Sequence, residues 1–105
     1  MAWIYLLLAG VCEIGWPIGL KMANGKHPWM WTIFAIVAMA LSGYMLYQAQ
    51  KSIPMGTAYA IWTGIGAVGA FTVGILFFKD GISFFRLLSV FFIIIGIVGL
   101  KLSAH

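Results

Sequence analysis

The sequence predicts an all-α membrane protein, with four transmembrane helices in a single domain covering residues 1–105. Of the 105 residues, 64% are hydrophobic and only 8% are charged. A soluble domain of this size cannot hide so much apolar surface, because small domains leave a large fraction of their surface in water. The apolar residues also fall into four runs, each close to the roughly 20 residues that cross a hydrocarbon core as a helix.

The first two expected helices are separated by a polar break. The first covers about residues 3–20; it has no basic start and carries an acid in its middle, so we expect a retained helix rather than a signal peptide. Residues 21–28 contain the dipeptides Asn-Gly and His-Pro, which are typical of turns. The second helix is then expected over about residues 29–49.

The last two expected helices follow the same rule. The third covers about residues 57–78, after a break that contains Pro and Gly, and is uncharged throughout. The segment KDGIS forms the next loop, and the fourth helix covers about residues 84–100 and stops at Lys101. Such short loops leave no room for a soluble domain, so consecutive helices must be antiparallel neighbours.

The distribution of charge predicts how the chain inserts. Short-loop cations normally set the orientation of a membrane protein. Here one side carries the α-amine, Lys51 and Lys101, and the other carries Lys21, Lys26, Lys79 and Arg86. This small bias allows the chain to insert in either orientation. Four helices enclose little polar space, so we also expect a dimer. Together these points predict an antiparallel, dual-topology homodimer, which resembles the inverted repeats of many transporters. The cations form no cluster, so we expect no nucleic-acid partner.

The two acids of the chain lie in different settings. Asp80 lies in a loop, where we expect a solvated turn residue. Glu13 lies near the middle of the first helix, where a carboxylate costs about 2.5 to 3.5 kcal/mol on insertion scales. No Lys, Arg or His is expected inside a span to pair with it, which favours a functional role over a structural hydrogen bond. The lone Cys12 is interpreted as a packing residue, and no metal site or cofactor is expected.

Helical spacing places Leu6, Ala9 and Leu20 on the face of Glu13, together with three residues that could act at a site. Gly10 would permit close approach of another helix, and Trp16 would bring an indole N–H and a π face beside the carboxylate. A membrane tryptophan is otherwise a packing residue or an interfacial anchor, and both interpretations stay open. Pro17 is the third residue on this face.

The second and third helices offer further polar and aromatic groups. Ser42 could donate a hydrogen bond to Glu13 or back to its own helix. Tyr59, Trp62 and Thr63 recur at helical spacing, as a site lining or as ordinary packing. Glycines of the third helix would permit close helix contact and let the helix bend; they include Gly64, Gly66 and Gly69.

These residues predict a transporter rather than an enzyme. A carboxylate shielded from water can hold a proton when the site is empty and release it when a cation arrives. Competition between proton and cation is sufficient for antiport if the site opens to one side at a time. The alternatives are a broader exporter of quaternary ammonium and other hydrophobic cations, favoured by the aromatic side chains, and a non-transporting membrane subunit whose polar groups hold helices together.

Three stretches carry a family resemblance over the entire chain: AGVCEIGW with Glu13 and Trp16, GTAYAIWTGIGAVGA with Tyr59 and Trp62, and the terminal GIVGLKLS. With Ser42, they make the chain resemble the small multidrug resistance family, and specifically its guanidinium-exporter branch. The residues Trp16, Thr57 and Thr63 favour this branch over the one that exports polyaromatic cations.

The resemblance implies an antiparallel, dual-topology homodimer in the inner membrane of a bacterium, exchanging protons for guanidinium. It implies that Glu13 binds substrate and proton alternately, within a hydrogen-bond network formed by Trp16, Ser42, Tyr59 and Trp62. Guanidinium fits such a site, because its N–H groups form a fork that matches a carboxylate and its plane stacks on aromatic faces.

Pro17 departs from the family pattern, in which a small residue other than proline is usual. Proline has no N–H, so the helical hydrogen bond onto the carbonyl of Glu13 cannot form. We hypothesise that this kinks or widens the site and admits substituted guanidinium ions. The alternative is a tolerated membrane-helix proline whose freed carbonyl is satisfied by a neighbour.

Overall fold

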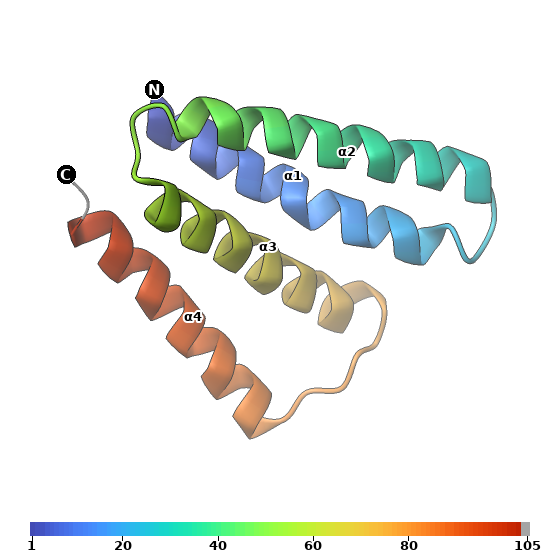
Figure 1. The fold of residues 1–105 in the computed structure, drawn as a ribbon. Helices are drawn as coiled ribbons and strands as arrows, with labels where there is room; N and C mark the ends of the chain where they lie inside the picture. Colours follow the sequence, from blue (N-terminus) through green and yellow to red (C-terminus); the bar gives the residue numbers. More distant parts are fainter. Residues whose placement is uncertain (104–105) are drawn as a thin grey trace.

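The computed structural model describes residues 1–103, and these form four helices joined by short loops (Figure 1). All four are long and apolar enough to cross a membrane, so the predicted four-helix, all-α fold is confirmed. The third helix begins two residues before the expected start, directly after Pro54, and the fourth runs three residues beyond its expected end. The helices are α1 (Ala2–Met22), α2 (Pro28–Ala49), α3 (Met55–Phe77) and α4 (Phe84–Ser103).

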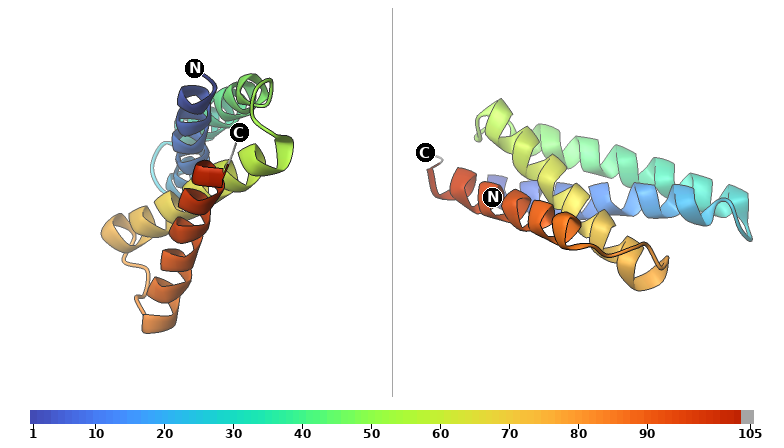
Figure 2. Two further views of the ribbon diagram at one scale, coloured as in Figure 1. Left: turned by 90° about the vertical axis from the view of Figure 1, so that its left-hand side faces the viewer. Right: turned by 90° about the horizontal axis from the view of Figure 1, so that it is seen from below.

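The helices form a flat assembly rather than a closed bundle. The helix α1 lies between α2 and α3, and α4 packs mainly against α3 (Figures 1 and 2). Lys101 of α4 also lies over the ring of Trp3 of α1, 4.5 Å from its centre. The overall extents of 45 × 34 × 16 Å reflect this shape, since the thinnest dimension is little more than one helix diameter. The start of α1 and the end of α4 lie at one end of the molecule, and the α1–α2 and α3–α4 loops lie at the other.

Glycines allow the helices to approach closely. A Cβ atom on Gly19 of α1 would lie 3.1 Å from the carbonyl oxygen of Trp31, so α1 and α2 are in near-backbone contact there. On the other side of α1, Gly69 of α3 receives the side chain of Ile14, and Gly64 of α3 receives Ile97 of α4. Van der Waals fit of this kind drives helix association where lipid is as apolar as the side chains. Each of these glycines therefore has a specific partner on a neighbouring helix.

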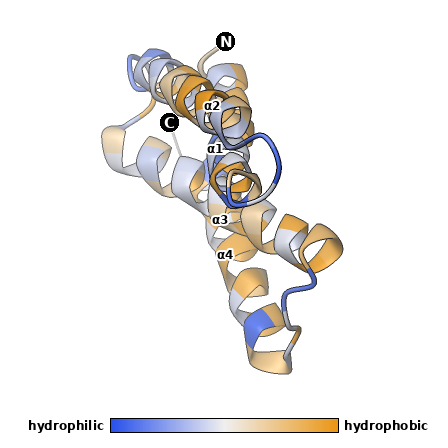
Figure 3. Cartoon of the chain, turned by 90° about the vertical axis from the view of Figure 1, so that its right-hand side faces the viewer, coloured by the Kyte–Doolittle hydropathy of each residue, from blue (hydrophilic) through white to orange (hydrophobic). Residues whose placement is uncertain are grey.

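Most large apolar side chains lie on the outer surface. The helix α4 has no buried residue, and exposed large apolar side chains occur on all four helices. Figure 3 shows apolar colour along the helices and polar colour chiefly in the loops and at the start of α4. An apolar surface this extensive would drive aggregation in water, whereas the hydrocarbon core of a bilayer can cover it. The described chain has the architecture of a multi-pass membrane protein.

Candidate functional site

The carboxylate of Glu13 lies near the middle of α1 and is bonded within its own helix. The indole Nε1–H of Trp16 donates to Oε1 of Glu13 over 2.6 Å, and both side chains are half-buried. Residues three apart lie on one face of a helix, which is why the two groups meet without help from tertiary structure. This hydrogen bond fixes the orientation of the carboxyl group against the indole ring.

Ser42 connects the three helices around this carboxylate. It lies on α2 and is fully buried, and its hydroxyl accepts a 2.7 Å hydrogen bond from Nε1 of Trp62 on α3. The same hydroxyl lies 2.8 Å from the carbonyl oxygen of Ala9 and 3.4 Å from Oε2 of Glu13. A hydroxyl has one hydrogen to donate, so the shorter contact to Ala9 takes it. The hydrogen bonds of Ser42 therefore run between helices, and none runs back to α2 within the described residues.

The stem of Glu13 lies directly on the backbone of α3 at Gly66. A Cβ atom on Gly66 would lie 2.5 Å from Cγ of Glu13, far inside van der Waals contact. One turn earlier, a Cβ atom on Gly10 would lie 2.7 Å from Cγ2 of Ile65. The α1–α3 crossing at the acid therefore depends on both glycines, one from each helix.

The remaining residues singled out from the sequence lie farther out. The ring of Tyr59 lies 5.3 Å from that of Trp62, but its side chain is 56% exposed and has no hydrogen bond to the Glu13 group among the described residues. Thr63 is exposed as well. Both residues face away from the helices of their own chain, so any contact they make in a site must involve lipid, substrate or another chain.

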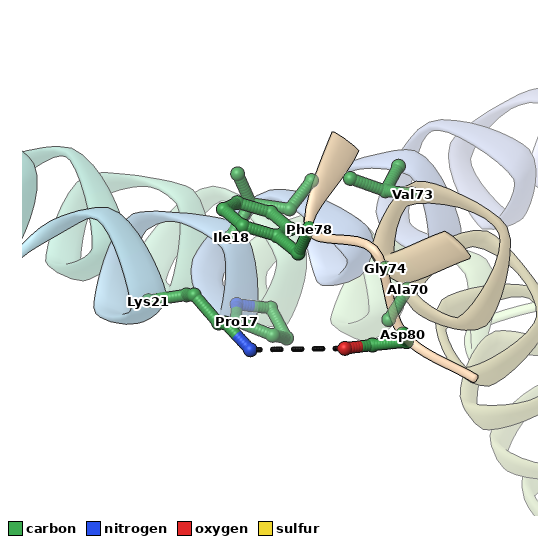
Figure 4. Close-up of a pocket in the computed structure, with 8 residues that line it drawn as sticks. All are labelled: Pro17, Ile18, Lys21, Ala70, Val73, Gly74, Phe78 and Asp80. Carbon is green, nitrogen blue, oxygen red and sulfur yellow. Dashed lines mark ion pairs between the residues drawn. The ribbon is translucent and has the colours of Figure 1, made fainter. Parts of the chain in front are cut away.

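Pro17 lies one turn beyond Glu13, and α1 runs through it without interruption. It lines a cavity of about 100 Å³ between α1 and the end of α3. Figure 4 shows the residues that line it, with Lys21 of α1 and Asp80 joined by an ion pair. The proline therefore belongs to the space between the Glu13 group and the α3–α4 loop.

The carboxyl group of Glu13 has no cationic partner among the described residues. The described residues contain one ion pair, between Lys21 and Asp80, so no cation of the chain neutralises Glu13 within this part of the protein. One indole N–H, from Trp16 of α1, donates to the acid, and a second, from Trp62 of α3, donates to Ser42 beside it. Among residues 1–103 no group of three His, Cys, Asp or Glu side chains could hold a metal ion.

Sequence reasoning did not identify two of these contacts. The carbonyl of Ala9 as the main acceptor for Ser42 was missed, although a small residue four positions before Glu13 is a sign that another helix can approach the backbone there. The pairing of Asp80 with Lys21 was also missed, since the two residues are far apart in the chain.

Comparison with known proteins gives consistent matches over the whole chain. The family model described as Small Multidrug Resistance protein matches residues 1–95. A protein of Salmonella typhimurium strain LT2 is 52% identical over 105 residues, covering 100% of both chains, and one of Citrobacter freundii is 51% identical with the same coverage. A protein of Yersinia pseudotuberculosis is 49% identical over 104 residues, which is 99% of this chain and 100% of the relative. All three relatives carry the name Guanidinium exporter.

Proposed function

Because the chain belongs to the small multidrug resistance family, we propose that it is a proton-coupled antiporter that exports guanidinium ions across the bacterial inner membrane. The name of its full-length relatives supports the substrate. The observation that carries the mechanism is the carboxylate of Glu13, which lies mid-helix without a cationic partner among the described residues and beside the indole N–H of Trp16. The relatives are named as exporters, and we assign a transport function rather than an enzymatic one.

The chemistry of the site explains why a proton and a cation would exclude each other. An unpaired carboxylate is costly inside a membrane, so Glu13 is stable there with a proton or with a bound cation. A guanidinium ion can place two N–H groups on the two carboxylate oxygens and its plane against an indole. Arrival of the cation releases the proton, and arrival of the proton releases the cation, which is the exchange that antiport requires.

We further propose that the working unit is an antiparallel homodimer. The flat shape of the single chain, the exposed apolar surface of α4 and the outward-facing side chain of Tyr59 all support a second copy that covers them. The near balance of positive charge between the two ends supports insertion in both orientations. In such a dimer two Glu13 carboxylates would share one chamber and titrate as a coupled pair.

One observation favours a broader substrate range. The aromatic pair of Tyr59 and Trp62 offers two ring faces to a cation that has no N–H groups. The alternative function is therefore export of quaternary ammonium or other hydrophobic cations, and substituted guanidinium ions fall between the two. A subunit that does not transport is the remaining alternative, with Glu13 serving only to hold helices together.

Uptake into proteoliposomes driven by a pH gradient tests these functions. We expect uptake of guanidinium, less of methylguanidinium, and little of tetraethylammonium. Glu13→Gln keeps an oxygen that accepts from Trp16 but cannot exchange a proton, so we expect it to abolish gradient-driven uptake. Uptake of tetraethylammonium in preference to guanidinium would support the broader exporter. Uptake by Glu13→Gln at the unmodified rate would refute the role of the carboxylate.

A further inference from the structure

The α3–α4 loop folds back onto the end of α1, at the end of the molecule away from the termini. The chain turns at Lys79, which has a left-handed backbone with φ of 57°. The backbone N–H groups of Phe78 and Asp80 both donate to the carbonyl oxygen of Gly74, over 3.1 and 3.0 Å. The carboxylate of Asp80 also lies against Gly74, in the space that a side chain at this position would occupy. Asp80 is therefore attached to the end of α3 and must move with that helix.

The side chain of Lys21 joins this loop to α1. Its Nζ lies 3.9 Å from Oδ1 of Asp80 and 5.3 Å from the centre of the Phe78 ring (Figure 4). Both charged side chains are about half exposed, at 55% and 52%. An exposed ion pair of this kind changes an equilibrium by only about 1.4- to 5-fold, so it can be broken readily. The contact is suited to a reversible closure rather than to holding the fold together.

The cavity behind this ion pair lies one helical turn from the Glu13 group. The cavity between α1 and α3 is lined by Pro17, four residues after Glu13, and by Ala70, four residues after Gly66. Residues four apart are neighbours along a helix face, so the cavity occupies the next helical turn beyond the Glu13–Gly66 contact. The cavity therefore lies between the Lys21–Asp80 pair and the helical turn that carries Glu13.

We propose that Lys21 and Asp80 form a latch that closes the α1–α3 gap at this end of the chain and opens when the site is exposed to that face. This inference rests on the proposed transport function. In an antiparallel dimer the two copies place their latches on opposite faces of the membrane. One latch then guards each face, and alternating access corresponds to opening one while the other is closed.

Chemical modification of a cysteine in the cavity tests the latch without measuring transport. In a Cys12→Ala background, Ala70→Cys places a thiol behind the ion pair, and Val73→Cys is a second such position if the first variant fails to fold. We expect a membrane-impermeant thiol reagent to react about 2- to 5-fold faster when Lys21→Gln or Asp80→Asn is added. Equal rates in the presence and absence of these substitutions would overturn the latch.

Two matched variants separate the latch from general effects of charge. Lys26→Gln removes the same charge from the same end but touches no acid among the described residues, so we expect it to leave the modification rate unchanged. The exchanged pair Lys21→Asp with Asp80→Lys keeps the net charge of that end, and we expect it to restore the slow rate. A failed restoration would overturn the ion pair as the cause.

Guanidinium uptake measured on the same preparations distinguishes the two proposals. If the latch variants react faster with the thiol reagent and the unmodified protein shows no guanidinium uptake, the proposed function is wrong while the latch stands. If guanidinium uptake is normal and the thiol rates are equal in all variants, the latch is wrong while the proposed function stands.

Discussion

The close contact between Gly66 and Glu13 allows a sharp prediction for Gly66→Ala. The added Cβ atom would lie 2.5 Å from Cγ and 3.2 Å from Cβ of Glu13. Carbon atoms in contact prefer a separation of about 3.5 to 4.0 Å, so the stem of the glutamate or the helix that carries it must shift by about 1 Å. The shift displaces the carboxylate from its 2.6 Å hydrogen bond with Trp16.

The expected size of the effect follows from the cost of overpacking. Adding a methyl group to a filled site costs about 1 to 3 kcal/mol. If the carboxylate must regain its position to bind a cation, this cost appears as a rise of about 5- to 150-fold in the Kd for guanidinium. Because proton binding uses the same carboxylate, we expect gradient-driven uptake to fall together with affinity.

Isothermal titration with guanidinium and uptake into proteoliposomes measure these effects. Gly56→Ala is the matched control, since Gly56 lies on the same helix and has no atom within 4 Å of its Cβ position. We expect the control to bind and transport at the unmodified level. Wild-type affinity in Gly66→Ala would refute the inference that the glutamate stem depends on the absence of a side chain at this position.

Three further substitutions test the hydrogen bonds of the site and the helix that carries it. Ser42→Ala removes the buried hydroxyl that accepts the indole N–H of Trp62, so we expect the Kd for guanidinium to rise about tenfold. An unchanged Kd would show that Ser42 has no part in binding. Trp16→Phe keeps a ring but removes the donor to Glu13, and we expect the Kd for guanidinium to rise about fivefold in the same titration. An unchanged Kd would contradict the role of that donor. Pro17→Ala restores the N–H that can bond to the carbonyl of Glu13, and we expect uptake of methylguanidinium to fall relative to guanidinium; a constant ratio would contradict a selectivity role for the proline.

Several features could be predicted from the sequence because they depend on short stretches of chain. The length and apolar composition of each run determine that it forms a membrane-spanning helix, and the structure contains all four. The hydrogen bond between Trp16 and Glu13 depends only on their spacing of three residues within one helix. The proposal that Glu13 is the functional acid rests on the cost of placing a carboxylate at that depth, which depends on its position in the sequence.

The tertiary structure alone decided which groups meet between helices. Whether Ser42 bonds to Glu13, to Ala9 or to its own helix depends on how α1 and α2 are rotated against each other, and the close approach at Gly19 and Ala35 sets that rotation. The same kind of fit places Gly66 against the side chain of Glu13 and Asp80 beside Lys21. It also leaves Tyr59 exposed. Helices that are apolar on nearly every side have no hydrophobic stripe to show which face turns inward. In such a protein the sequence determines the helices and the central acid, while the steric fit of glycines against large side chains determines how the site is assembled.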